Sequence, residues 1–279
     1  MASEEQRDTD NTAGGPIPPA GLPTGDGDTE SEWFDEWFRS DFYLKLYSHR
    51  DREEAEACVD LILRSVTRPA PTDGPPRALD LACGPGRHAI SLAERGFAVT
   101  AVDLSPPLLA FAASQAREAG ADIRFVRSDM REIDFLNEFD LVLQLFTSFG
   151  YFDDHADDYS VLQRVRASLR HGGFYALDLI NERRLRRTLI PRSVKSVDGT
   201  DLTEERRIVD GRVEKIISIR PPDGRTRKFV ESVQLYSPET IEGMLYDTGM
   251  APLHWFGGYD GTPFNPETSE RMLVVSQAL

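Results

Sequence analysis

The chain has 279 residues, enough for an enzyme-sized domain, and its formal net charge at pH 7 is −15. Such an acidic balance argues against a nucleic-acid partner, whose phosphates require a basic surface. The sequence shows no apolar run long enough for a membrane helix, no secretory signal and no disulfide framework, having only two cysteines. We therefore expect a cytoplasmic protein with neither a membrane nor a nucleic-acid partner.

The first part of the chain separates into a tail and a helical region. Residues 1–31 are rich in Gly, Pro, Asp, Glu and Thr and nearly lack large aliphatic side chains, which predicts a disordered acidic tail. An aromatic stripe within 33–38 and an apolar series within 55–66 both follow the helical period. We expect an N-terminal helical cap and a proline-rich linker over residues 32–76.

A glycine-rich turn is the strongest functional signal. The string LDLACGPGRHA combines an apolar run, a turn with Gly84 and Gly86, and a helix start. Asp103 ends the next apolar run about 20 residues later, where a carboxylate accepts hydrogen bonds from a cofactor ribose. The string also fits the dinucleotide pattern G-x-G-x-x-A. Asp80 favours S-adenosylmethionine instead, because a carboxylate there would repel a pyrophosphate and attract a sulfonium and an ammonium group.

Three more strands are predicted along the chain. Asp129 and Met130 directly follow the apolar run at 123–126. A buried strand at 139–145 leads into an aromatic segment at 146–152, which suits a pocket wall but also suits plain core packing. A glycine turn and a further strand then end near Asn181.

The string DLACGPGR resembles the first motif of class I S-adenosylmethionine-dependent methyltransferases, and the later signals follow in that family's order. The resemblance implies an α/β fold with a Rossmann-like seven-stranded sheet in the order 3-2-1-4-5-7-6. It also implies S-adenosyl-L-methionine as cofactor, S-adenosyl-L-homocysteine as product, an adenine contact at Asp129 and ring packing by Met130. We assign further cofactor contacts to Ala82, Leu104 and Leu145.

Strand-like runs follow within 194–236, and Asp210–Gly211 and Asp223–Gly224 supply hairpin turns between them. They predict a three-stranded antiparallel lid inserted into the core. With this lid, the body is similar to bacterial small-molecule methyltransferases such as sugar N,N-dimethyltransferases and glycine N-methyltransferase-like enzymes. The expected layout is a cofactor-binding core at 77–193, the lid at 194–236 and a return to the core at 237–279.

In that group the N-terminal segment folds over the cofactor, so we assign Tyr47 and Arg50 to the methionine carboxylate, which an arginine matches with two hydrogen bonds. Arg50 fits nearly as well as a surface partner of Glu54. Candidate catalytic groups are His49 and His155, as bases, and Tyr47. Candidate substrate contacts are the aromatic residues after the fourth strand, the polar residues ending the fifth, and the start of a basic cluster, namely Phe149, Tyr151, Asp178, Asn181 and Arg183.

The cofactor already activates the methyl group, so the protein mainly has to align an acceptor and exclude water. We expect transfer to N or O of a small-molecule acceptor, with secondary metabolism as a setting, and no metal. One alternative is a methyltransferase acting on RNA or DNA, although the chain lacks both the Asn/Asp-Pro-Pro-Tyr segment and the Pro-Cys nucleophile. Another is a protein that binds the cofactor without turnover. The lid strands could pair across a homodimer.

Overall fold

The computed structural model describes residues 32–46, 52–66, 74–197, 199–222 and 224–279. The chain divides into Met1–Ser31 and Glu32–Leu279, and the first unit, with its expected disordered tail, lies outside the described residues. All structural statements below therefore concern Glu32–Leu279.

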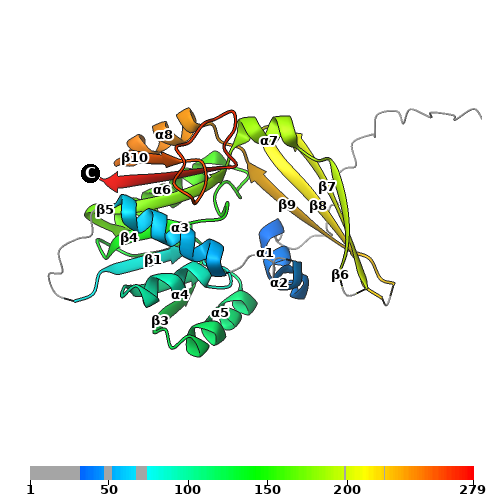
Figure 1. Ribbon diagram of the computed structural model, residues 1–279, viewed down its shortest axis with the longest axis horizontal. Coiled ribbons are helices and arrows are strands. Elements are labelled where there is room, and N and C mark those ends of the chain that lie inside the picture. The colour runs from blue at the N-terminus through cyan, green and yellow to red at the C-terminus, as the bar shows by residue number, and fades with distance from the viewer. Residues whose placement is uncertain (1–31, 47–51, 67–73, 198, 223) are drawn as a thin grey trace, which may run out of the picture. The chain divides into compact units, whose positions relative to one another are not determined.

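The core of this unit is a seven-stranded sheet with the order β10-β11-β5-β4-β1-β2-β3 (Figure 1). The five strands β3, β2, β1, β4 and β5 are parallel to their neighbours in that order. Strand β11 is antiparallel to both β5 and β10. Read in chain order, this is the predicted arrangement 3-2-1-4-5-7-6, which is confirmed. The strands are β1 Arg77–Leu81, β2 Ala98–Asp103, β3 Ile123–Arg127, β4 Phe139–Gln144, β5 Leu169–Ile180, β10 Met250–Phe256 and β11 Arg271–Ala278.

Helices cover both faces of this sheet because successive strand residues point to opposite sides. In β1, Leu79 packs in a cluster with residues of α6 and α8, whereas Ala78 packs in another cluster with residues of α3 and α4. Side-chain caps define three helix starts, at Ser105, Asp154 and Ser237, and the Ser237 side chain accepts from the Thr240 N–H. The helices are α3 Arg52–Ser65, α4 Arg87–Glu94, α5 Pro106–Glu118, α6 His155–Ser168, α7 Glu182–Thr188 and α8 Pro238–Asp247.

The aromatic stripe near the N-terminus forms α1, Trp33–Phe38, and is followed by α2, Asp41–Leu46. The two sides of α1 bury different residues. Phe34 belongs to the core cluster of the large sheet, and Trp37 packs with Leu202, Ile217, Ile219 and Phe229 of the inserted sheet. The Trp37 Nε1–H also donates to Glu231 Oε1 at 2.7 Å. The first helix therefore contacts both sheets.

The inserted sheet has four antiparallel strands, so the prediction of a three-stranded lid was wrong in strand number (Figure 1). The additional strand comes from the basic segment after α7, where Gly199, with φ +76°, allows the tight return into the next strand. The expected Asp210–Gly211 turn is present, with φ +49° and +79°. Asp223 lies outside the described residues. The strands are β6 Arg192–Val197, β7 Thr200–Val209, β8 Arg212–Arg220 and β9 Arg227–Gln234.

Within the described ranges, no helix is long and apolar enough to cross a membrane. The same ranges hold no group of three or more His, Cys, Asp or Glu residues arranged to bind a metal ion.

Candidate active site

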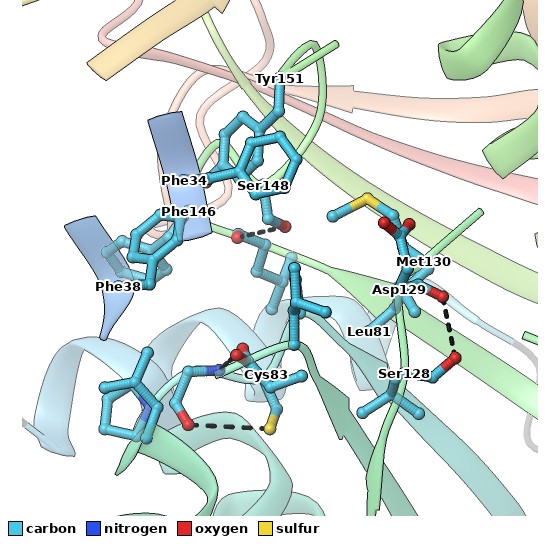
Figure 2. Close-up of a pocket in the computed structure, with 18 of the residues that line it drawn as sticks. Phe34, Phe38, Leu81, Cys83, Ser128, Asp129, Met130, Phe146, Ser148 and Tyr151 are labelled. Atoms are coloured by element: carbon cyan, nitrogen blue, oxygen red, sulfur yellow. Dashed lines mark hydrogen bonds between the residues drawn. The ribbon is translucent and has the colours of Figure 1, made fainter. Parts of the chain in front are cut away.

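A pocket lies at the carboxyl ends of β1, β2, β3 and β4, where open α/β sheets bind their ligands (Figure 2). It holds about 830 Å³ of space not filled by atoms, part of it open to solvent. Figure 2 shows Phe34, Phe38 and Tyr151 on one side of the pocket and Asp129 and Met130 on another. Two chemically different walls therefore face the same space.

Asp103 is held at the pocket by main-chain donors. The Gly84 N–H donates to Oδ2 and the Ser105 N–H donates to Oδ1, both at 2.8 Å. Burial raises the pKa of the Asp103 carboxyl, and the N–H groups of Ser105 and Gly84 oppose that shift. A carboxylate oxygen keeps accepting capacity beyond one hydrogen bond, so Asp103 can still bind ligand hydroxyl groups.

The glycine turn requires left-handed backbone. Gly84 has φ +53° and Gly86 has φ +80°. A Cβ on Gly86 would come within 2.8 Å of the Ala112 Cβ on α5, so this glycine allows α4 and α5 to pack closely. Gly84 lines the pocket, whereas Gly86 is not among the lining residues. Both glycines were expected to contact the cofactor. The structure places only Gly84 at the pocket and gives Gly86 a packing role between the helices.

Asp80 is the penultimate residue of β1 and is only 1% exposed. Burial raises the pKa of its carboxyl to about 7, nearby Asp103 raises it as well, and the Ala89 N–H and Arg87 lower it. Its Oδ2 has no hydrogen-bond partner among the described residues. Asp80 does not line the pocket. A buried carboxyl with an unsatisfied oxygen is costly, and a cationic ligand group above the glycine turn would offset that cost.

Asp129 and Met130 line the pocket as expected, but Asp129 is already engaged. The Arg131 guanidinium donates to both of its oxygens, at 3.1 and 2.7 Å, and the Arg131 N–H donates to Oδ1 at 2.8 Å. Arg131 also pairs with Glu32 at 2.7 Å. The buried Gln144 side chain donates to Met130 Sδ at 3.5 Å. These contacts fix the orientation of both residues before any ligand binds.

The segment after β4 provides the aromatic wall. Phe146 and Thr147 have φ +56° and +64°, a conformation that is costly for residues other than glycine. Tyr151 lines the pocket and packs against Trp33 and Phe34, with ring centroids 5.0 and 6.0 Å away. Phe149, an expected substrate contact, instead lies in the core at 1% exposure, and the left-handed Gly150, with φ +85°, separates it from Tyr151.

The other expected substrate residues belong to the scaffold around the pocket and not to its lining. Asp178 is fully buried and binds the Arg271 guanidinium. The Asn181 side chain donates to the carbonyl oxygens of Pro266 and Ser269 at 3.0 and 2.8 Å. Arg183 pairs on the surface with carboxylates, as do its basic neighbours, the partners being Glu239, Glu267, Glu270 and Glu182.

Neither of the two histidines expected as bases is found at the pocket among the described residues. His155 begins α6, its Nδ1 lies 2.9 Å from the Tyr236 hydroxyl, and that hydroxyl donates to Asp158 at 2.6 Å. His155 borders a separate hollow against α8 and not the main pocket. Tyr47, His49 and Arg50 lie outside the described residues.

The remaining assigned cofactor residues, Ala82, Leu104 and Leu145, line the pocket. Sequence reasoning missed two groups of lining residues. The first is Phe34 and Phe38, which the sequence indicated only as part of a helical aromatic stripe. The second is Arg87 and His88, which begin α4, with the Arg87 guanidinium 5.0 Å from the centroid of the Phe146 ring. Their position directly after the glycine turn is the sequence signal that could have identified them.

The sheet order, the pocket at the carboxyl ends of its parallel strands and the glycine turn beside Asp103 together define the class I methyltransferase fold. Comparison with known proteins agrees, because residues 78–173 match the family model described as a methyltransferase domain. The expected resemblance to class I S-adenosylmethionine-dependent methyltransferases is confirmed for this domain and fold. One solved structure with this fold, an amino pentose methyltransferase from Micromonospora echinaspora, holds S-adenosylmethionine.

Curated relatives match over part of their length. A putative methyltransferase of Geobacillus is 33% identical over 138 residues, which cover 50% of this chain and 54% of that protein. A glycine/sarcosine N-methyltransferase of Parasynechococcus marenigrum is 33% identical over 161 residues, covering 56% of this chain and 55% of that protein. The chain thus spans about half the length of these two relatives.

Solved structures share the fold over most of the chain. An S-adenosylmethionine-dependent methyltransferase from Clostridium acetobutylicum has a TM-score of 0.72 at 22% sequence identity, covering 85% of this chain and 96% of that one. A sugar N-methyltransferase from Streptoalloteichus has a TM-score of 0.64 at 23% identity, covering 93% and 98%. These likenesses establish the fold.

Proposed function

We propose that this protein transfers a methyl group from S-adenosyl-L-methionine to a nitrogen atom of a small-molecule acceptor. The observation that carries the proposal is the composition of one pocket. Asp103 and the Gly84 turn stand on the wall suited to a nucleoside, and aromatic rings from α1 and the segment after β4 form the other wall. The N-methyltransferases among the relatives support nitrogen over oxygen as the acceptor atom.

The residues at the glycine turn and around the pocket suit this cofactor. Asp103 would accept from the ribose hydroxyls, and Met130 would lie against the adenine beside Asp129. Asp80, whose Oδ2 has no partner among the described residues, would supply the negative charge that the cationic methionine end requires. When bound, S-adenosyl-L-methionine brings a methyl group on a positively charged sulfur, which needs no activation by the protein.

The protein's remaining task is to orient the acceptor. Both carboxylates among the described lining residues are engaged, Asp103 by main-chain N–H groups and Asp129 by Arg131, so neither is arranged as a free base. An amine needs only to be neutral to attack, whereas a hydroxyl usually needs a base to remove its proton. The rings of Phe34, Phe38 and Tyr151 exclude water and favour the positive charge that develops on an attacked nitrogen.

The acceptor is a small molecule, since sugar and glycopeptide N-methyltransferases share the fold and the chain is strongly acidic. The setting is secondary metabolism in the cytoplasm. A homodimer, if it forms, would use the lid strands.

Calorimetric titration with S-adenosylmethionine, S-adenosylhomocysteine and NADH tests the cofactor first. We expect micromolar binding of the first two and none of NADH. Transfer of labelled methyl from the cofactor is then measured for a panel of amino sugars and other amines, each paired with its hydroxyl analogue. Methylation of the hydroxyl member alone, or binding of NADH alone, would overturn the proposal.

A further inference from the structure

The turn between β7 and β8 brings the lid against the segment that follows β4. Asp210 and Gly211 both have positive φ, which gives the turn the twist that a two-residue hairpin requires. The turn places Arg212 at the first position of β8. Beside it, the Gln234 N–H donates to the Gly150 carbonyl at 2.7 Å. The lid thus contacts the backbone of the aromatic wall at its β7–β8 end.

The Arg212 guanidinium joins the two parts. Toward the aromatic wall it donates to three successive carbonyl oxygens, those of Gly150, Tyr151 and Phe152, at 3.3, 3.0 and 2.7 Å. Toward the lid it donates to the Ser232 hydroxyl at 2.8 Å and to the Ser232 carbonyl at 2.9 Å. The side chain is 13% exposed, so these bonds are largely shielded from water.

Two of the three bonded carbonyls belong to residues that line the pocket. Tyr151 and Phe152 both face it, and Gly150, with φ +85°, sets the direction in which the chain enters them. A Cβ on Gly150 would lie 2.9 Å from the Gln234 carbonyl oxygen, so the lid approaches this backbone closely. Arg212, which does not line the pocket, therefore holds the backbone that carries the Tyr151 and Phe152 rings.

We propose that Arg212 is a positioning residue for methyl transfer, holding Tyr151 and Phe152 at the pocket from the lid. This inference rests on the proposed function for its effect on turnover. A planar guanidinium donates in several directions at fixed angles, whereas a lysine ammonium has three donors around one point on a flexible stem. Lysine keeps the charge at this position but cannot reach the carbonyls and Ser232 together.

The test compares Arg212→Lys with Arg207→Lys in the full chain. Arg207 is a matched control, because it lies on β7 of the same sheet and bonds Glu214 at 2.6 Å within the lid. Hydrogen exchange followed by mass spectrometry is measured on peptides covering 145–153, together with kcat and KM for the acceptor. For Arg212→Lys we expect faster exchange in this segment and a loss of kcat/KM on the order of tenfold to a hundredfold. Both values should stay near wild type in Arg207→Lys.

Unchanged exchange at 145–153 in a folded Arg212→Lys protein would overturn the inference, whatever the activity. The exchange readout needs no acceptor, so its result separates this inference from a failure of the proposed function, which would show as absent cofactor binding in the wild type. If Arg212→Lys does not fold, Ser232→Ala decides, because it removes one of the lid-side acceptors. We expect Ser232→Ala to accelerate exchange in the same segment, and no acceleration there would overturn the inference.

Discussion

Arg271 on β11 binds both carboxylate oxygens of Asp178 on β5, with Nε–Oδ1 and Nη2–Oδ2 distances of 2.9 and 2.6 Å. The same carboxylate accepts from the Phe146 N–H at 2.9 Å and from the Tyr259 hydroxyl at 2.8 Å. Arg271 also donates to Thr147 Oγ1 at 3.0 Å. The ion pair therefore holds the left-handed Phe146–Thr147 step from which the aromatic wall begins.

Replacing Asp178 with Asn should destabilise the protein strongly. The change leaves the guanidinium of Arg271 buried without its counter-charge, which costs about 3–5 kcal/mol of the free energy of unfolding. Urea unfolding at pH 7 measures this. Arg183→Ala serves as control, since it removes exposed pairs of 3.5 Å that contribute about 0–1 kcal/mol. A fully stable Asp178→Asn protein would show that this buried pair does not hold the segment.

Gly86→Ala should destabilise the glycine turn. Its φ of +80° disfavours a Cβ, and that Cβ would meet the Ala112 Cβ at 2.8 Å, so we expect a loss on the order of 2–4 kcal/mol. Gly243→Ala on α8 is the matched control, because a Cβ there meets nothing within 4 Å. In a helix that change should stabilise by about 0.5–1 kcal/mol. Thermal unfolding of both variants checks the prediction, and equal shifts would contradict it.

Cofactor affinity should rise with pH through the pKa of Asp80, which burial raises to about 7. Only the ionised carboxylate attracts a cationic ligand, so affinity is low below that pKa and increases above it. Between pH 6 and 7.5 the ionised fraction grows about eightfold, and the association constant of S-adenosylhomocysteine should follow. Calorimetry at the two pH values measures the change, which Asp80→Asn should remove. A pH effect that persists in Asp80→Asn belongs to another group.

The same carboxyl affects the stability of the ligand-free protein with the opposite sign. The folded state keeps a proton on Asp80 at pH values where the unfolded chain, with an ordinary pKa near 4, has lost it. The contribution of Asp80 to stability is therefore greatest below pH 4 and declines as pH rises to about 7. Chemical unfolding of wild type and Asp80→Asn should show this decline as a difference between the two proteins, and parallel pH curves would contradict it.

Tyr236→Phe should destabilise more at neutral than at acid pH. The lost hydroxyl donates to Asp158, and burial raises the pKa of that carboxyl to about 6. Above pH 6 the variant leaves a buried carboxylate without this donor, at a cost of about 1–3 kcal/mol. Near pH 4.5 the carboxyl is protonated and needs the donor less. Urea unfolding at pH 4.5 and 7.5 measures the difference, with Tyr246→Phe, an exposed tyrosine of α8, as control.

Local sequence patterns determined the sheet, the turns and the position of the pocket. The glycine turn and Asp103 act over about 20 residues, and the Asp210–Gly211 turn over two, so their chemistry is readable without knowing what packs around them. The order of apolar runs then allowed few arrangements of a parallel sheet, because crossover connections have one handedness.

Only the tertiary structure decided which side chains enter the pocket. Asp178 meets Arg271 across 93 positions of sequence, and no local pattern indicates that partner. Phe149 and Tyr151 are two residues apart and equally aromatic, yet Phe149 is buried in the core and Tyr151 lines the pocket, with the left-handed Gly150 between them. The sequence determined what could form locally, and long-range packing determined where each side chain points.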